Sequence, residues 1–149
     1  MKNLYMKNRC LVLAVFLMFS MLLGYASNVD SLLLLTQSED LNVRIDAFLA
    51  LSQDKNLSSE ARINYSLNSL KISRQIQDKE AEAFANLSAG AAYTDGGYYD
   101  KAVFSLQTSI QIFDSLGNKK FRARALEVLG RTYFYLKQPE RSLEMMQES

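Results

Sequence analysis

Two pairs of neighbouring carboxylates are the residues of this chain best suited to acid–base chemistry: Glu80 with Glu82, and Glu39 with Asp40. Paired carboxylates allow one group to donate a proton while the other accepts one. Both pairs, however, stand where helices are predicted to begin, and the helix dipole favours negative charge there. We therefore interpret the pairs as helix-starting charge and expect no catalytic residue.

The glycine pair Gly96-Gly97 and the missing residue types exclude several other kinds of site. The glycines lack the lysine and the strand context of a phosphate-binding loop. The chain has no histidine, and its single cysteine, Cys10, lies in an N-terminal apolar run. This composition excludes zinc fingers, haem attachment, thiol catalysis and histidine-based triads. We expect no enzyme activity, no cofactor and no metal site.

The charge balance argues against a nucleic acid as partner. The formal net charge is only +1, so it indicates neither a nucleic acid nor an anionic membrane surface as partner. The densest basic cluster is Lys119-Lys120 with Arg122 and Arg124. It lies at a predicted helix start, where solvated charge is the commoner explanation and an acidic ligand is the alternative.

An internal repeat with a period of 40 residues indicates which elements position the charged residues and glycines described above. Small residues and aromatics recur in register: Gly90 with Gly130, Tyr93 with Tyr133, and Ala102 with Ser142. A fixed period of this kind is typical of stacked-repeat proteins.

Helical spacing of apolar residues, with capping and breaking residues between, predicts an all-α fold. Asp30 is expected to cap a short first helix. Longer helices are predicted at 41–55, 59–76, 79–94, 98–116, 119–136 and 139–149. The connections are short, so consecutive helices should lie antiparallel as hairpins.

The repeated small residues have a predicted packing role. Gly90 and Gly130 should let paired helices approach closely, with Ala102 and Ser142 opposite them. Tyr93 and Tyr133 should fill the gap beside them, with each ring buried and each hydroxyl near the solvent-exposed edge of the contact. In the helix at 59–76, the residues predicted to turn inward are Ile63, Leu67, Leu70 and Ile72.

The N-terminal segment predicts export. Lys2, Lys7 and Arg9 precede an apolar run from Cys10 to Leu23, and Gly24-Tyr25-Ala26 then offers a cleavage site. These features are typical of a secretory signal peptide at 1–26, followed by a helical domain at 27–149 in the periplasm or outside the cell. The alternative is an uncleaved anchor, but the run falls short of the about 20 apolar residues that span a bilayer.

The pattern of Gly90, Tyr93 and Ala102, with the turn from Asp95 to Lys101, resembles the tetratricopeptide repeat family, in a long-pitch variant of the exported bacterial type. The resemblance implies an α-solenoid of antiparallel helix hairpins wound into a right-handed superhelix. Its repeats would cover 40–77, 79–117 and 119–149, the last incomplete. The first repeat departs from the motif, because Gln53 replaces the tyrosine and Arg62 replaces the alanine.

In a repeat of this family, the inner groove is lined by first-helix residues outside the core positions. Arginines and aromatics in such a groove suit peptide recognition, because these side chains often dominate binding energy. For Phe134 the alternative is packing against a neighbouring repeat. The groove positions implied by the resemblance are Phe84, Leu87, Ala91, Thr94 and Asp95, then Arg124, Glu127, Arg131, Phe134 and Tyr135.

The sequence thus favours a non-catalytic, exported scaffold that binds a protein or peptide in its concave groove. The alternative is the sensory N-terminal part of a membrane-bound bacterial signalling protein, similar to histidine kinase regulators. Leu143 and Met146 share one face of the final helix, where a following repeat would cover them. A partner, a second subunit or missing repeats would account for that face.

Overall fold

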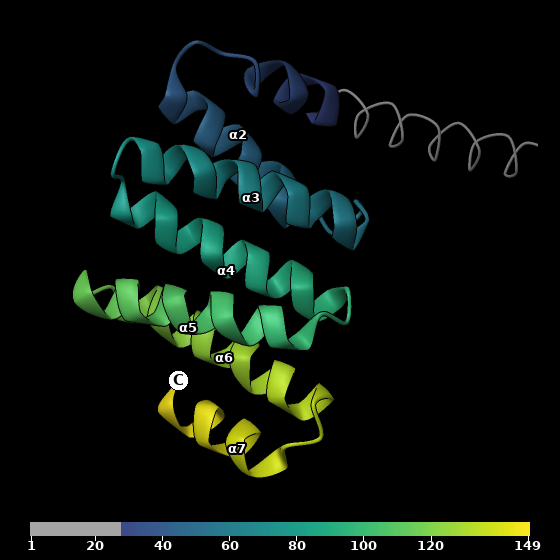
Figure 1. Cartoon of the computed structure of the whole chain (residues 1–149), viewed down its shortest axis with the longest axis vertical. Helices are drawn as coiled ribbons and strands as arrows, with labels where there is room; N and C mark the ends of the chain where they lie inside the picture. The colour runs from purple at the N-terminus through teal and green to yellow at the C-terminus, as the bar shows by residue number, and fades with distance from the viewer. Residues whose placement is uncertain (1–27) are drawn as a thin grey trace, which may run out of the picture.

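The structure is a computed structural model that describes residues 28–149, and every regular element in that range is a helix. A helical segment covers 28–35. The helices that follow are α2 (Leu41–Gln53), α3 (Ser59–Gln75), α4 (Lys79–Asp95), α5 (Tyr99–Ser115), α6 (Lys119–Tyr135) and α7 (Pro139–Glu148). The all-α prediction is confirmed. Figure 1 shows the helices stacked one after another from α2 to α7.

Capping side chains explain where most helices begin. Each capping residue accepts a hydrogen bond from a backbone N–H of the first turn that has no partner within the helix. The distances are 2.8 Å for Asp40, 3.2 Å for Ser58, 2.9 Å for Asp78 and 3.4 Å for Asn118. Asp30 does not act as such a cap, because the chain is already helical at residue 28.

The helices α3 to α6 share one length and one kind of exit turn. Each is 17 residues long, and successive helices from α3 to α7 start 20 residues apart. One residue per turn has a left-handed backbone, which closes a Schellman motif. These residues are Gln77, Gly97, Gly117 and Lys137. The 40-residue period is therefore two helices and two equivalent turns.

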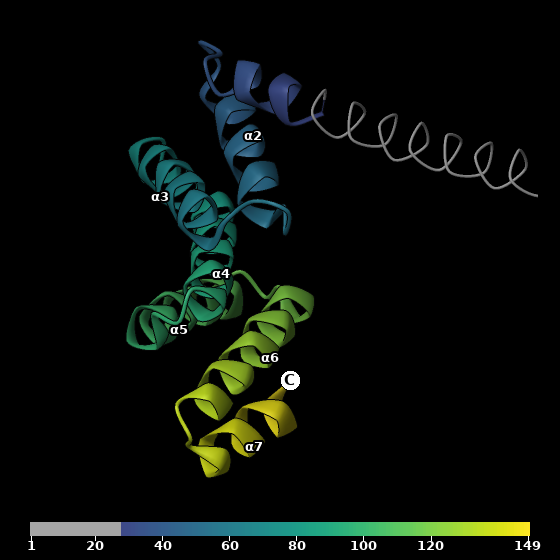
Figure 2. The same ribbon diagram turned by 90° about the vertical axis from the view of Figure 1, so that its right-hand side faces the viewer.

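The helices pack as two layers around α4. Figure 2 shows α3 and α5 on the left, α2 and α6 on the right, and α4 between them. Helix α4 contacts α3 and α5 as well as α2 and α6. Its buried residues consequently lie on nearly every side of the helix, from Ala81 to Thr94. The packing is consistent with a helical repeat array.

The predicted close approach at Gly90 is confirmed. A Cβ atom at Gly90 would lie 2.5 Å from the Cγ of Leu106, and both Ala102 and Leu106 are fully buried. Gly130 packs less tightly, with the carbonyl oxygen of Ser142 at 3.2 Å from such a Cβ. The two tyrosines differ: Tyr133 is buried, whereas Tyr93 is only half-buried.

The predicted inward face of α3 is wrong at Leu67, which is 42% exposed. The buried positions of α3 instead carry small or hydrogen-bonded polar residues: Arg62, Ser66, Ser69 and Ser73, together with Ile72. Serine fits a close helix contact because it is small and its hydroxyl can bond to its own helix. Ser73 donates in this way to the carbonyl of Leu70, at 3.0 Å.

The predicted signal peptide at 1–26 and Cys10 lie outside the described residues. No helix within 28–149 is both long and apolar enough to cross a bilayer. At the other end, Leu143 is 58% exposed and Met146 is 52% exposed on α7.

Candidate ligand-binding groove

A groove of about 240 Å³ is lined mainly by residues of α2, α4 and α6. The loop after α2 and the start of α3 close one end of it. The residues that line it are Ser52, Gln53, Lys55, Arg62, Phe84, Leu87, Ser88, Ala91, Phe121, Arg124, Glu127, Val128 and Arg131.

Phe84 and Phe121 form an apolar floor in the groove, and Phe113 packs beneath them. The ring of Phe84 on α4 lies edge-on to Phe121 on α6 at 4.6 Å and to Phe113 on α5 at 5.1 Å. Phe113 is fully buried and stacks on Phe121 at 5.7 Å. Edge-on and offset contacts of this kind favour one arrangement of the rings. The floor is therefore formed before any ligand arrives.

A buried arginine fixes the end of the groove. Arg62 on α3 is 5% exposed, and its Nε donates to the carbonyl oxygen of Ser52 at 3.0 Å. Its NH1 donates to Asp95 Oδ2 at 2.8 Å, which ties the start of α3 to the end of α4. A buried guanidinium needs acceptors for its donors, and this pair of bonds supplies them.

Two further cationic side chains approach Asp95 at longer distances. Lys55 Nζ lies 3.8 Å from its Oδ2, and Arg131 NH2 lies 4.0 Å from its Oδ1. At such distances and exposures an ion pair contributes little. Arg124 forms no ion pair with any residue in 28–149, and the buried Nε of Arg131 has no hydrogen-bond acceptor there. The groove thus keeps cationic donors that no described side chain satisfies.

The structure brings most of the sequence-predicted groove residues together. Asp95 lies at the edge of the groove, held by Arg62. The residues that line it directly are Phe84, Leu87, Ala91, Arg124, Glu127 and Arg131.

Thr94 does not belong to an open surface, and its assignment is corrected. It is 3% exposed, and its hydroxyl pairs with Thr132 Oγ1 of α6 at 2.8 Å. Phe134 and Tyr135 lie outside the lining residues: Tyr135 stacks on Tyr99 at 5.7 Å, and Phe134 is 65% exposed beside it.

Sequence reasoning missed the contribution of the first hairpin. Lys55 and Arg62 line the groove, yet neither was among its expected residues. The signal was present in the sequence, because an arginine stands at 62 where the repeat motif has a small residue. A charged side chain at a buried packing position requires hydrogen-bond acceptors, and Asp95 and Ser52 supply them.

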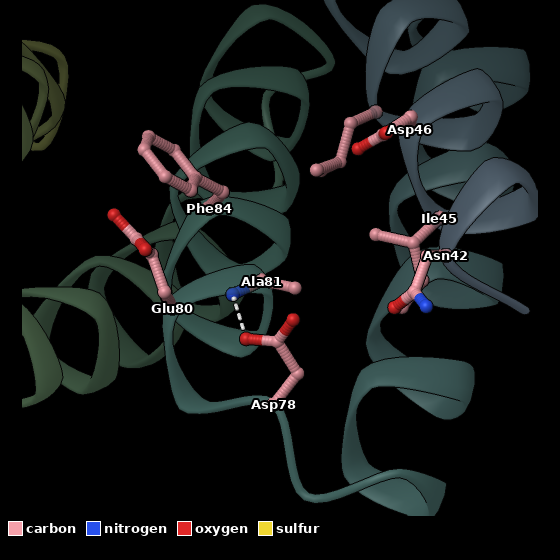
Figure 3. A pocket seen from close by; sticks show the side chains of 8 residues that line it. Asn42, Ile45, Asp46, Asp78, Glu80, Ala81 and Phe84 are labelled. Carbon is pink, nitrogen blue, oxygen red and sulfur yellow. Dashed lines mark hydrogen bonds between the residues drawn. The ribbon is translucent and has the colours of Figure 1, made fainter.

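A second pocket of about 190 Å³ adjoins the groove between the first halves of α2 and α4. Phe84 lines both. The carboxyl-bearing residues of this pocket are Asp46, Asp78 and Glu80, and no lysine or arginine lines it among the described residues. Figure 3 shows Asp46 on α2 across from Ala81 and Phe84 on α4, with Asp78 bonded to the amide of Ala81.

The groove also continues past its other side. A shallow hollow of about 460 Å³ includes Lys120 and Ser149 and shares Phe121, Arg124 and Glu127 with the groove. The groove and these two pockets therefore adjoin one another, with carboxylates near the start of α4 and Lys120, Arg124 and Arg131 on α6.

The carboxylate pair at the start of α4 has a structural setting. Glu82 is 7% exposed, and it accepts from Lys79 Nζ and Arg74 Nε, each at 2.8 Å. The hydrogen bond from Lys79, more than any other cause, lowers the pKa of Glu82. An ion-paired carboxylate of low pKa suits helix pairing better than proton donation. No cluster of potential metal ligands is found within 28–149.

A search of protein-family models finds no match to this chain, and no curated protein matches it either.

Proposed function

We propose that this chain is a non-catalytic scaffold of the tetratricopeptide repeat type that binds a peptide segment of another protein. The concave groove between α2, α4 and α6 is the binding surface. In this proposal the protein is exported after removal of residues 1–26, and the helices wind into a right-handed superhelix. The mechanism is binding to a preformed surface, with no covalent step and no cofactor.

The observation that carries the proposal is the groove itself. Its floor of packed phenylalanines is rigid, and its end is fixed by the bonds of Arg62 to Ser52 and Asp95. A pocket whose shape is set in advance loses little conformational entropy on binding. Apolar rings with arginines around them are the residue types that most often dominate binding energy.

The experiment that tests the proposal is selection of binders from a displayed library of random peptides on the purified protein. We expect selected peptides to lose binding when Arg124 and Arg131 are both changed to alanine. The control is Phe104→Ala, which removes a side chain that is 71% exposed on α5, outside the groove. Peptides that bind both variants equally, or a selection without binders, would contradict the proposal.

Export has a separate test. N-terminal sequencing of the protein recovered from the periplasm or the medium should find a start after Ala26. A protein that retains Met1 would instead indicate an anchor.

A further inference from the structure

The unmatched charges of the groove indicate what its ligand must carry. Arg62 already uses one oxygen of Asp95 at 2.8 Å, whereas Arg131 and Lys55 approach that carboxylate only to 4.0 and 3.8 Å. Arg131 Nε is buried without an acceptor. The Arg131 side chain as a whole is 39% exposed, and Arg124 is exposed and forms no ion pair within 28–149. Their terminal N–H groups are therefore open to a ligand carboxylate, and charge-assisted bonds of this kind are the strong ones.

The acidic pocket on the far side of Phe84 gives the two ends of the surface opposite charges. Asp46 and Glu80 are exposed there and form no ion pair within 28–149. A segment that crosses Phe84 therefore passes from a surface that favours anions to one that favours cations.

The distance between the two regions can be taken from α4. Ala81 lines the acidic pocket and Ala91 lines the groove, ten residues further along the helix. Ten residues of α-helix correspond to about 15 Å. An extended peptide covers that distance in about four or five residues.

We propose that the groove recognises an extended, internal segment of a partner protein in which an acidic and a basic residue flank an apolar one. The acidic side chain binds Arg124 and Arg131, the apolar side chain packs on Phe84, and the basic side chain faces Asp46 and Glu80. The segment is internal rather than a chain end, because the surface continues beyond the groove in both directions. This inference rests on the proposed function and specifies its ligand.

The test is fluorescence anisotropy with short synthetic peptides, blocked at both ends, in glycine–serine backgrounds. One peptide carries two aspartates, then a leucine, then two lysines, with about four residues between the charge centres. A second peptide carries the charges in the reverse order, so that both directions of binding are tested. There are three control peptides. The first has the same composition as the ordered peptides but alternating charges. The second carries only the aspartates, and the third carries only the aspartates and ends in a free carboxyl terminus.

One of the two ordered peptides should bind at least about tenfold more tightly than the alternating control, since each charge-assisted bond adds about that factor. Equal binding of the ordered and alternating peptides would overturn the inference. Tighter binding of the aspartate peptide with the free carboxyl terminus would overturn it too, because the ligand would then be a chain end.

Charge reversal makes the test sharper. Arg124→Glu with Arg131→Glu should abolish binding of the ordered peptide and create binding of a peptide with lysines in place of the aspartates. The matched control is Lys71→Glu with Lys119→Glu, which changes the same charge at exposed positions outside the groove. Loss of binding in the control variant as well would show a general charge effect and contradict the inference.

The two proposals fail in different ways. Groove-dependent peptides from the random library without the ordered charges would refute this inference and leave the proposed function standing. An absence of any groove-dependent peptide would refute both.

Discussion

The close contact at Gly90 makes a quantitative prediction about stability. In Gly90→Ala the new Cβ would lie 2.5 Å from Leu106 Cγ and 2.7 Å from its Cδ2. Leu106 is fully buried, so its side chain has no free space to enter. Overpacking of a core costs about 1–3 kcal/mol, and a contact this short belongs at the upper end of that range. Alanine regains about 1 kcal/mol of helix propensity. We expect a net loss of about 2 kcal/mol.

Gly130→Ala is the matched control, because it makes the same chemical change in the equivalent helix. Its new Cβ would lie 3.2 Å from the carbonyl oxygen of Ser142 and 3.3 Å from Met146 Cγ, contacts that a shift of α7 by a few tenths of an ångström relieves. The propensity gain should then offset the contact, leaving stability unchanged or raised by up to about 1 kcal/mol.

Urea unfolding followed by far-ultraviolet circular dichroism measures both variants. The double variant Gly90→Ala with Leu106→Ala should be less destabilised than the sum of its single changes, because the second removes the atoms that clash. The reasoning is refuted if Gly90→Ala is as stable as the parent protein. It is also refuted if the two changes in the double variant simply add.

Three further predictions concern charges and turns. Arg62→Ala should lower the free energy of unfolding by about 2 kcal/mol, since it removes a buried partner of the partly solvated Asp95. Lys55→Ala, which loses only a 3.8 Å contact at an exposed side chain, should cost under about 0.5 kcal/mol by the same denaturation assay. The pKa of Glu82 lies below its ordinary value of 4.5, so its ion pairs stabilise the fold above that pH and are lost as the pH falls. Glu82→Gln should therefore be less stable at neutral pH and lose less stability on acidification; parallel pH profiles for the two proteins would contradict this. Gly117→Ala should cost about 1 kcal/mol from backbone strain alone, because φ is +67° and nothing lies within 4 Å of the new Cβ. An unchanged melting curve would show that the turn is not strained.

The helix boundaries were predictable because they depend on local chemistry. Asp78 and Asn118 cap helices through their own side chains, and glycine ends two helices where the backbone is left-handed. Pro139 similarly occupies the first turn of α7. Such signals act within a few residues, so no knowledge of the tertiary structure is needed.

The inward face of α3 was not predictable from hydrophobicity. Leu67 is 42% exposed while Ser66 and Ser69 are fully buried, and Ser66 donates to the carbonyl of Arg62 in its own helix. Which face of α3 is covered depends on the helices packed against it, so it cannot be read from the hydrophobicity of α3 alone.

The groove was predicted in part because residues 40 positions apart are expected to occupy equivalent places in successive repeats. The register fails at Thr94 and Phe134, which are equivalent in sequence but opposite in exposure. Thr94 is covered by α6, where it meets Thr132, whereas no described helix covers Phe134. A position in a repeat array is thus buried or exposed according to its neighbour as well as its register. Lys55 and Arg62 were missed for a related reason, since the first repeat lacks the motif that would have placed them.

The position of α4 between four other helices has a consequence for local unfolding. In an array whose units contact mainly their neighbours, the ends open at lower free energy than the middle. The groove lies over α4, has α2 and α6 as its two walls, and takes Phe121 of its floor from α6. Opening of either end therefore removes a wall while α4 stays in place. A ligand that touches both walls would hold the ends closed, and amide hydrogen exchange in α2 and α6 would slow on binding. The measured affinity would then include the free energy of closing those ends as well as that of the contacts.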